Sequence, residues 1–179
     1  MRWNLDPTHA EVEFAVKHLM ISTVKGRFKT FTGTGRTNPD GTLKAVDMAI
    51  DVASIDTNTQ QRDDHLRSPD FFDVAGHPQI TFASTTVTQT GSDVTIAGDL
   101  TIRGVSRPVT LRGEYTAPSK DPWGNSRAAL AVSAKINRKD WGLGWNMALE
   151  AGGVVVGEEV KLSVEVEAVA VEEPVTAAA

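Results

Sequence analysis

Four histidines and one carboxylate cluster are the residues best suited to chemistry in this sequence. The histidines are His9, His18, His65 and His77. No pair of them has the i,i+4 or alternate-strand spacing of a metal site, so neither a metal centre nor a cofactor is predicted. Asp63-Asp64-His65 is the densest polar group, but neighbouring helical residues point about 100° apart and do not converge as an acid–base pair without help from the fold. An enzyme that uses Asp63, His65 or His18 as acid or base on a small hydrophobic substrate is therefore kept as an alternative hypothesis.

The charge balance argues against polyanionic partners. Lys and Arg number 18 against 23 Asp and Glu, which gives a formal net charge of -5 and a pI near 5.3. The resulting field repels polyphosphates, so nucleic acid is not expected as a partner and anionic membrane surfaces are not favoured. The chain has no cysteine, which excludes disulfides, thiolate metal sites and cysteine nucleophiles.

No targeting or membrane-spanning segment is recognisable. A secretory signal combines a basic stretch, an apolar run and a small-residue cleavage site, and none of these precedes Trp3. The chain also has no run approaching the roughly 20 apolar residues of a membrane span. We therefore expect a cytoplasmic location and no integral membrane segment.

The elements that must position any site are strands, because apolar and polar residues alternate almost throughout the chain. Within 43–54, for example, Val46, Met48 and Ile50 share one face and Asp47 and Asp51 share the other. The same pattern predicts about eight strands, joined by short turns into an antiparallel meander. Their expected ranges are 11–17, 24–37, 43–54, 79–88, 94–103, 106–116, 127–137 and 159–167.

A meander with one apolar face per strand must close into a barrel or fold over as a sandwich, since an open sheet leaves long edges unpaired. A barrel of about eight strands is just wide enough to fill with side chains or to hold one small ligand. Composition alone leaves the filled core and the ligand cavity equally open.

The sequence predicts one helix and one C-terminal tail. The helix is expected from Thr57 to Arg67, with Thr57 and Gln60 as a capping box and Asp63 paired with Arg67. Because Phe71-Phe72 follows directly, the segment suggests a lid over a barrel mouth. A single domain is expected over 1–170, and the tail, 171–179, contains Glu172-Glu173-Pro174.

The order of short motifs along the chain resembles that of the YceI-like family, over about residues 3 to 169. The motifs that carry the resemblance are Trp3-Asn4-Leu5-Asp6, Phe14-Ala15-Val16-Lys17-His18, Val24-Lys25-Gly26-Arg27-Phe28, Ser54-Ile55-Asp56-Thr57, Arg62-Asp63-Asp64-His65-Leu66, Phe71-Phe72-Asp73, His77-Pro78-Gln79-Ile80-Thr81-Phe82, Gly98-Asp99-Leu100-Thr101-Ile102-Arg103-Gly104-Val105 and Ile136-Asn137-Arg138-Lys139-Asp140-Trp141-Gly142-Leu143.

The resemblance implies an all-β fold, a single extended antiparallel eight-stranded lipocalin-like barrel with one short helix over or beside its mouth. It also implies non-catalytic binding, transport or storage of a long-chain isoprenoid lipid, of the polyprenyl phosphate or isoprenoid quinone type, in the barrel interior. The residues expected to line the apolar tunnel are Phe14, Val16, Phe28, Phe31, Met48, Ile50, Phe71, Phe72, Phe82, Leu100 and Trp141.

The head group of such a ligand would meet a few polar side chains at the mouth. By position these are Arg62 and His65 on the helix, with Arg27 and Arg138 behind them. Arg62 has a second interpretation as a structural clamp that pairs with Asp63, or with Asp56 and Asp70.

Two further hypotheses concern surfaces. The protein could be an interaction module whose barrel is only a scaffold, which would show an exposed apolar patch and no deep tunnel. The segment Trp141-Gly142-Leu143-Gly144-Trp145 could support a homodimer, and a rim that docks on a membrane would have the same aromatic character.

Overall fold

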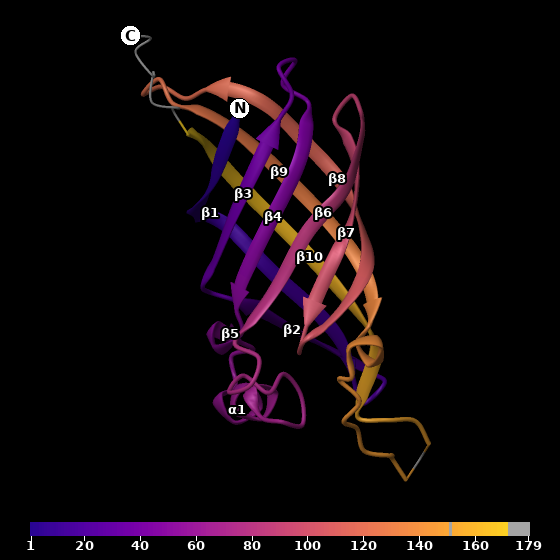
Figure 1. The fold of residues 1–179 in the computed structure, drawn as a ribbon. Helices are drawn as coiled ribbons and strands as arrows, with labels where there is room; N and C mark the ends of the chain where they lie inside the picture. The colour runs from indigo at the N-terminus through magenta and orange to yellow at the C-terminus, as the bar shows by residue number, and fades with distance from the viewer. Residues whose placement is uncertain (151, 172–179) are drawn as a thin grey trace.

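The alternating segments form ten strands in the computed structural model, which describes residues 1–150 and 152–171 (Figure 1). The strands are β1 (Arg2–His18), β2 (Ser22–Phe28), β3 (Phe31–Thr37), β4 (Leu43–Asp51), β5 (Ile55–Asp56), β6 (Gln79–Thr90), β7 (Asp93–Ile102), β8 (Val105–Lys120), β9 (Ser126–Asn137) and β10 (Val156–Val171). The helices are the α-helix α1 (Gln60–Arg67) and two 3₁₀ turns, η1 (Val52–Ser54) and η2 (Arg138–Trp141).

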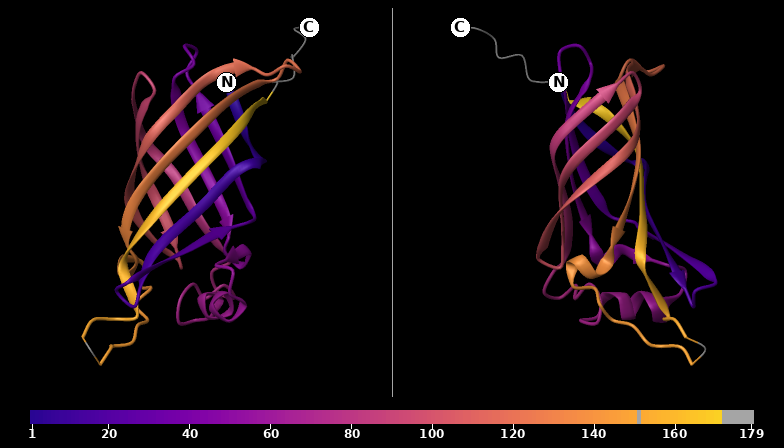
Figure 2. Two further views of the ribbon diagram at one scale, coloured as in Figure 1. Left: turned by 180° about the vertical axis from the view of Figure 1, so that it is seen from behind. Right: turned by 90° about the vertical axis from the view of Figure 1, so that its right-hand side faces the viewer.

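Eight of these strands close into an antiparallel barrel, as predicted. The pairing runs from β10 through β9, β8, β7, β6, β4 and β3 to β1, and β1 returns to β10. Arg2 lies opposite Val171 and His18 lies near Val156, so the seam between β1 and β10 spans both strands. The barrel is elongated, with strands that tilt steeply across it (Figure 2). Closure removes the free edges that a sandwich or an open sheet would keep.

On the side away from β10, the long strand β1 pairs with two different strands, because it contains a bulge. Arg2–Asn4 pairs with β3, whereas Val12–His18 pairs with β2. Between them the β1–β10 register shifts between Leu5 and Ala10. This bulge contains Asp6 and His9, which hydrogen-bond to each other outside the ladder. The expected single strand over 24–37 is therefore two strands, broken at Lys29–Thr30, each paired with a different half of β1.

The two ends of the barrel differ. The helix end is the end that carries α1, the β1–β2 turn at 19–21 and the loop 142–155; the opposite end carries the N-terminus and the β3–β4 turn (Figures 1 and 2). At the helix end β2 extends beyond the barrel and pairs with the two-residue strand β5. The α-helix α1 and the loop that follows η2 thus lie at the same end of the barrel (Figures 1 and 2).

The helix is shorter than expected. It begins at Gln60 with Thr59 as N-cap, and Thr59 makes no side-chain capping bond. The predicted capping box is wrong because the Thr57 hydroxyl and N–H both donate to the buried Asp63 carboxylate, at 2.6 and 2.8 Å. The expected Asp63–Arg67 pair is also wrong, since Arg67 binds Asp64 at 3.0 Å. The carboxylate of Asp63 therefore anchors the start of the segment instead of facing Arg67.

The predicted strand over 43–54 ends at Asp51, because Val52–Ser54 turns into η1 with the Asp51 side chain accepting from the Ala53 N–H. At the other end of the chain, Val171 is the last residue of β10 and not the first residue of a tail. The rest of the predicted tail, 172–179, lies outside the described residues.

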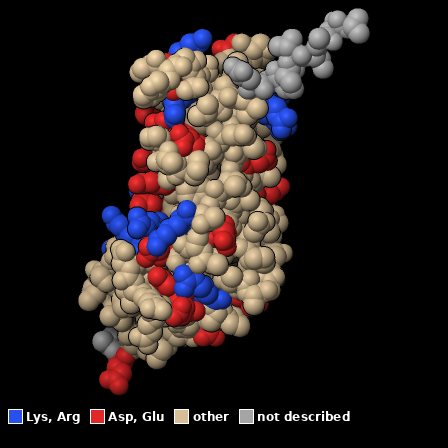
Figure 3. Space-filling view, turned by 90° about the vertical axis from the view of Figure 1, so that its left-hand side faces the viewer, with Lys and Arg blue, Asp and Glu red and all other residues tan. Residues whose placement is uncertain are grey.

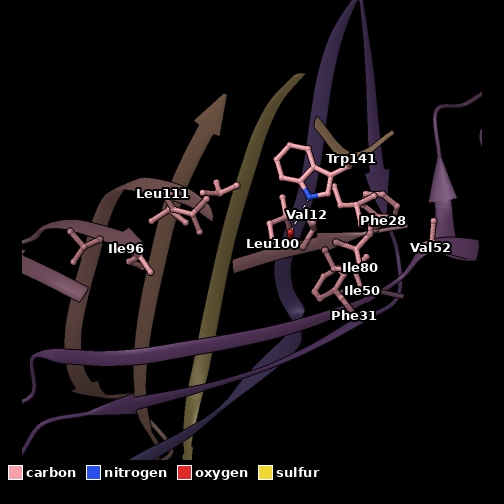
Figure 4. Packing of buried hydrophobic residues seen from close by; sticks show 14 of the residues in the cluster. Val12, Phe28, Phe31, Ile50, Val52, Ile80, Ile96, Leu100, Leu111 and Trp141 are labelled. Atoms are coloured by element: carbon pink, nitrogen blue, oxygen red, sulfur yellow. Dashed lines mark hydrogen bonds between the residues drawn. The ribbon is translucent and has the colours of Figure 1, made fainter. Parts of the chain in front are cut away.

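Buried apolar side chains pack along the inside of the barrel, from Trp3 and Leu43 near the opposite end to Val52 and Trp141 near the helix end. Figure 4 shows Trp141 above Leu100, with its indole Nε1 donating to the Leu100 carbonyl at 2.9 Å. Trp141 and Ile96 are almost completely buried, at 2% and 0% exposed. Gly26 leaves room for a neighbouring ring, because a Cβ there would lie 2.2 Å from Cζ of Phe14. The buried side chains therefore fill part of the interior but not all of it.

Candidate functional site

An apolar cavity of about 230 Å³ runs through the barrel interior. It is lined from the opposite end, by Trp3 and Tyr115, through the middle, by Met48 and Leu162, to the helix end, by Phe72. Several wall side chains remain only half-buried although they point inward, because the space in front of them is unfilled. These half-buried wall residues include Phe14, Val16, Met48, Phe82, Leu130 and Leu162.

Most of the predicted tunnel residues line this cavity. They are Phe14, Val16, Phe28, Met48, Ile50, Phe71, Phe72, Phe82 and Leu100. Phe31 and Trp141 are buried in the core but are not part of the lining. Trp141 is turned instead toward the Leu100 carbonyl, which satisfies its indole N–H within the wall. Whether the lining residues contact a ligand stays a prediction.

The predicted lining omitted one whole wall. Alternate residues of β10 from Val160 to Ala168 face the cavity, as do Leu130 and Ile136 of β9. Their signal was present in the sequence, because the same period-two alternation that placed Met48 and Ile50 inside applies to Val160–Val166. The expected tunnel residues included none from β9 or β10.

The opposite end of the cavity is closed by hydrogen-bonded aromatic residues. The Trp3 indole donates to the Thr37 hydroxyl at 3.1 Å, and the Tyr115 hydroxyl donates to the Gly41 carbonyl at 3.1 Å. Trp3 and Tyr115 are 2% and 4% exposed, and burial raises the pKa of the Tyr115 phenol. These bonds fix two bulky rings across the opposite end, so an entrance there would require both to move.

At the helix end, Arg138 is the buried charged residue of the lining. Its Nε donates to the Gly157 carbonyl at 2.8 Å, and its Nη atoms donate to Trp145 at 3.0 Å, to Val156 at 3.3 Å and to Leu143. Burial lowers the pKa of this guanidinium, but an arginine remains charged throughout the accessible pH range. Arg138 therefore holds the loop that follows η2 against the start of β10.

The other two charged residues of the lining, Glu13 and Asp47, lie on outward positions of β1 and β4 and are exposed. Their carboxylates are therefore in water. Among the residues that the structure describes, the interior surface is apolar apart from Arg138 and a few hydroxyl and indole groups at the opposite end.

An aromatic contact joins the two segments that cover the helix end. The imidazole of His65, on α1, packs edge-on against Phe71 and Trp145, with ring centroids 5.2 and 4.6 Å apart. Phe71 and Trp145 also contact each other, at 5.4 Å. Arg103, in the β7–β8 turn, donates to the Phe71 carbonyl at 2.9 Å. We call His65, Phe71 and Trp145 the aromatic latch.

Three of the four predicted head-group residues do not line the cavity. Arg62 donates to the Thr57 hydroxyl and carbonyl, both at 2.8 Å, so the carboxylate partners proposed for its clamp role are wrong. Arg27 and Lys29 share the carboxylate of Asp56 at 3.5 and 2.9 Å. The bond from Lys29, with that from the Asn58 N–H, lowers the pKa of Asp56 to about 2.

The third, His65, lies 2.9 Å from the Asp70 carboxylate and belongs to the aromatic latch. Arg138 is thus the predicted head-group residue that the fold brings to the cavity. A head-group role for any of the four stays a prediction.

The residues of the alternative, catalytic hypothesis are not brought together. Asp63 accepts from Thr57, His65 packs in the aromatic latch, and His18 ends β1; none of the three lines the cavity. Within the described part of the chain, no three His, Asp or Glu side chains lie close enough to hold a metal ion. The helices found there are also too short and too polar to cross a bilayer, α1 having eight residues.

Comparison with known proteins gives the same fold and a family. The family described as "YceI-like domain" matches residues 3–168. Protein YceI of Escherichia coli O17:K52:H18 is 42% identical over 164 residues, which cover 90% of this chain and 82% of that protein. The crystal structure of a Campylobacter jejuni YCEI protein is 31% identical, with a TM-score of 0.75 over 87% of this chain and 90% of the other.

A more distant structure shares the barrel. It is a polyisoprenoid binding domain from Saccharophagus degradans implicated in plant cell wall breakdown, 16% identical, with a TM-score of 0.69 over 94% of this chain and 98% of that chain. At this identity the likeness concerns the fold.

Proposed function

Since the chain belongs to the YceI-like family, we propose that it binds a long apolar isoprenoid lipid in the barrel cavity and releases it chemically unchanged. The observation that carries the proposal is the cavity itself, whose wall is apolar from one end of the barrel to the other. Apolar surface removed from water contributes about 25 cal/mol per Å², so an apolar chain gains affinity in proportion to the length that it inserts.

The shape of the cavity favours a long, thin ligand over a compact one. Five alternate residues of β10 line it, namely Val160, Leu162, Val164, Val166 and Ala168. A strand rises about 3.3 Å per residue, so this row extends roughly 26 Å along β10. Because a volume of about 230 Å³ is distributed over that length, the space is a narrow tunnel. A flexible hydrocarbon chain fills such a tunnel better than a fused-ring molecule does.

The ligand class is supported by the distant structure, whose description names a polyisoprenoid. Within that class the wall chemistry fits a branched isoprenoid chain, because it combines aliphatic residues of β9 and β10 with the aromatic rings of Phe14, Phe28 and Phe82. We infer transport or storage as the role, since nothing in the wall would act on the chain.

The ligand enters at the helix end and keeps its head group there. The opposite end is closed by Trp3 and Tyr115, whereas the helix end is covered by the aromatic latch and the loop 142–155. Arg138 has five N–H groups, of which four donate to carbonyls. Its remaining Nη2 N–H and its positive charge would meet a quinone carbonyl or a phosphate oxygen at this end.

Binding without catalysis is part of the proposal. General acid–base chemistry needs a titratable group within hydrogen-bond reach of the reacting atom. Asp63, His65 and His18 lie outside the cavity, and Arg138 does not titrate near neutral pH.

The test is whether the protein carries an isoprenoid and loses it when the tunnel is blocked. We expect native mass spectrometry of gently purified protein, with solvent extraction, to find a ligand of isoprenoid mass. Leu162→Trp places an indole in the middle of the tunnel and should abolish that ligand, while Lys161→Trp adds the same side chain on the outer face of β10 and should retain it. Protein that is repeatedly empty, or equal loading in both variants, would contradict the proposal. A ligand recovered with altered mass after incubation would contradict the absence of catalysis.

A further inference from the structure

Exposed large apolar side chains gather at the helix end. Leu19, Met20 and Ile21 form the β1–β2 turn and are 38%, 58% and 82% exposed, and Met147 in the loop 142–155 is 58% exposed. We call these four residues the tip patch. The two segments are joined, because the Leu19 N–H donates to the Val155 carbonyl at 2.8 Å and the Val155 N–H donates to the Met147 carbonyl at 3.0 Å. The tip patch is therefore one surface, beside the proposed entrance.

The conformation of the turn does not account for its apolar residues. Leu19 and Met20 have φ angles of 53° and 63°, in the left-handed region. Hairpin turns with positive φ at both central positions favour Asn-Gly, Asp-Gly or Gly-Gly, since a Cβ is strained there. This chain carries two long apolar side chains at those positions and exposes them to solvent. The residues are thus unfavourable for the turn and for solubility, which points to a binding role.

The segment 17–29, which contains the turn of the tip patch, is basic although the whole chain is acidic, whereas the loop that carries Met147 contains the exposed Glu150. Residues 17–29 contain Lys17, Lys25, Arg27 and Lys29 and no Asp or Glu, in a chain of formal net charge -5. Arg27 and Lys29 share Asp56, whereas among the described residues Lys17 and Lys25 form no ion pair. Lys17 follows the cavity-facing Val16, and Lys25 pairs with Ala15, which lies between the cavity-facing Phe14 and Val16. Both lysines therefore lie on the outer face of the hairpin and are exposed. In Figure 3 the largest group of Lys and Arg side chains lies at mid-height and just below it, with Asp and Glu side chains among and beneath them.

We propose that the tip patch docks the helix end on an anionic lipid bilayer, with the apolar side chains in the acyl region and Lys17 and Lys25 among the head groups. The expectation that net negative charge disfavours anionic membranes is thereby revised. Screening limits charge interactions to about 10 Å at 0.1 M salt, so the local lysines outweigh distant carboxylates. The observations that support docking are independent of the proposed function. Only the purpose of docking, which is to place the entrance against the membrane, depends on that function.

A bilayer fits this surface better than a second copy of the chain does. A symmetric dimer through the tip patch would bring Lys17 and Lys25 of both copies together, and like charges at an interface are unfavourable. An anionic bilayer instead offers an apolar layer beneath a negative surface, which matches an apolar tip in a basic segment.

The test is flotation of the purified protein with vesicles of phosphatidylcholine alone or with 30% phosphatidylglycerol. We expect binding to the anionic vesicles, weakened by 0.5 M NaCl. Leu19→Asn with Met20→Gly removes the apolar tip while giving the turn its preferred residues, so the variant should fold and should bind at least tenfold less. Lys17→Glu with Lys25→Glu should lose binding similarly. Trp123→Ser removes an 82% exposed apolar residue at the opposite end and should bind like the wild type.

No wild-type binding, or equal binding by the Leu19→Asn, Met20→Gly variant, overturns the docking. A concentration-dependent dimer that is seen by light scattering and that this variant abolishes would also overturn the docking. The outcomes separate the two proposals, because a protein that retains its isoprenoid but ignores vesicles overturns the docking alone.

Discussion

Arg127 shows what a single side chain contributes to the barrel seam. Its guanidinium reaches Asp6 at 2.9 Å, Asp121 at 3.0 Å and Glu167 at 3.1 Å, and so joins β1, the β8–β9 turn and β10. The Thr8 hydroxyl, then Arg127 and His9, hold the pKa of Asp6 well below its usual range. The Asn125 amide, together with Arg127, lowers the pKa of Asp121 to about 2.

These depressed pKa values predict an acid-sensitive stability. A carboxylate whose pKa is lower in the folded than in the unfolded state stabilises the fold above the unfolded pKa, near 4, and loses that contribution as the pH falls toward about 2. Arg127→Gln should therefore unfold at a pH higher by roughly half a unit, measured by tryptophan fluorescence and circular dichroism between pH 7 and pH 2. Lys135→Gln, which breaks only the exposed pair with Glu159, is the control. Coincident acid transitions in the two variants would show that the Arg127 network adds nothing.

At the residue scale the sequence predicted which side chains face inward better than what the polar ones do. Alternation placed Phe14, Met48 and Leu100 on the cavity wall because inward orientation follows from strand period alone. The partners of Arg62 and Asp63 were wrong because both bind Thr57, through a local turn before α1 that no periodicity encodes. Hydrogen bonds of this kind depend on backbone placement within a few tenths of an ångström.

Arg138 holds the start of the loop 142–155 against the start of β10. Removing Arg138 takes a donor from the carbonyls of Leu143, Trp145, Val156 and Gly157, of which the Val156 carbonyl also accepts from the Asn146 amide. We expect Arg138→Met to lower the free energy of unfolding by about 2–4 kcal/mol, since each buried group left unsatisfied costs about 1–3 kcal/mol and water will satisfy some of them. Urea unfolding and limited proteolysis should show the loss together with faster cleavage between 142 and 155. Arg107→Met, which loses one bond to the Asp140 carbonyl, is the matched control.

Unchanged cleavage in Arg138→Met would show that the aromatic latch and the other hydrogen bonds of the loop, such as those of Asn146 to Val156, hold it without Arg138. The variant also separates two roles of the residue. If Arg138 contacts a head group, the variant should lose charged isoprenoids more than uncharged ones, measured by displacement of a bound fluorescent lipid. If it only holds the loop, both kinds should weaken together.

The helices and strands were predicted well where apolar and polar residues alternate regularly, and poorly where they do not. The strands β6, β7 and β9 lie within two residues of their expected ranges, because apolar and polar residues alternate along their whole length. In contrast, β1 begins at Arg2, nine residues before the expected start at residue 11, and β10 extends from Val156 to Val171 beyond both ends of the expected 159–167. The division of 24–37 into β2 and β3 was missed, since the break at Lys29–Thr30 arises from the bulge in β1, a partner distant in the fold. The helix α1 begins three residues later than expected, because Thr57 binds the Asp63 carboxylate and does not cap the helix.

The whole molecule depends on one closure, between β1 and β10. A chain ending at Gly157 lacks almost all of β10 and leaves β1 and β9 as free edges. We expect it to show no cooperative unfolding transition by circular dichroism, because the apolar wall on β10 supplies one side of the interior. Addition of a peptide comprising residues 158–171 should restore the transition by strand pairing. A cooperative transition in the shortened chain without peptide would show that closure is not required.

For the whole molecule, the sequence predicted the barrel but not whether side chains fill its interior. Alternation required a closed or folded sheet, and the motif order selected the barrel. The packing inside could not be predicted, because whether facing side chains fill the interior depends on the tilt and stagger of the strands. The tilt and stagger of the strands cannot be predicted from any single segment of the sequence.

The seam between the first and last barrel strands also has a consequence for biosynthesis. At about 5–20 residues per second, a ribosome needs roughly 10–30 s to proceed from β1 to the end of β10. During that interval the strands already made expose the tunnel wall and have no partner to close it. The nascent chain therefore presents its most apolar surface for the whole of its synthesis, and holdase chaperones that shield exposed strands should determine how much of it reaches the closed state.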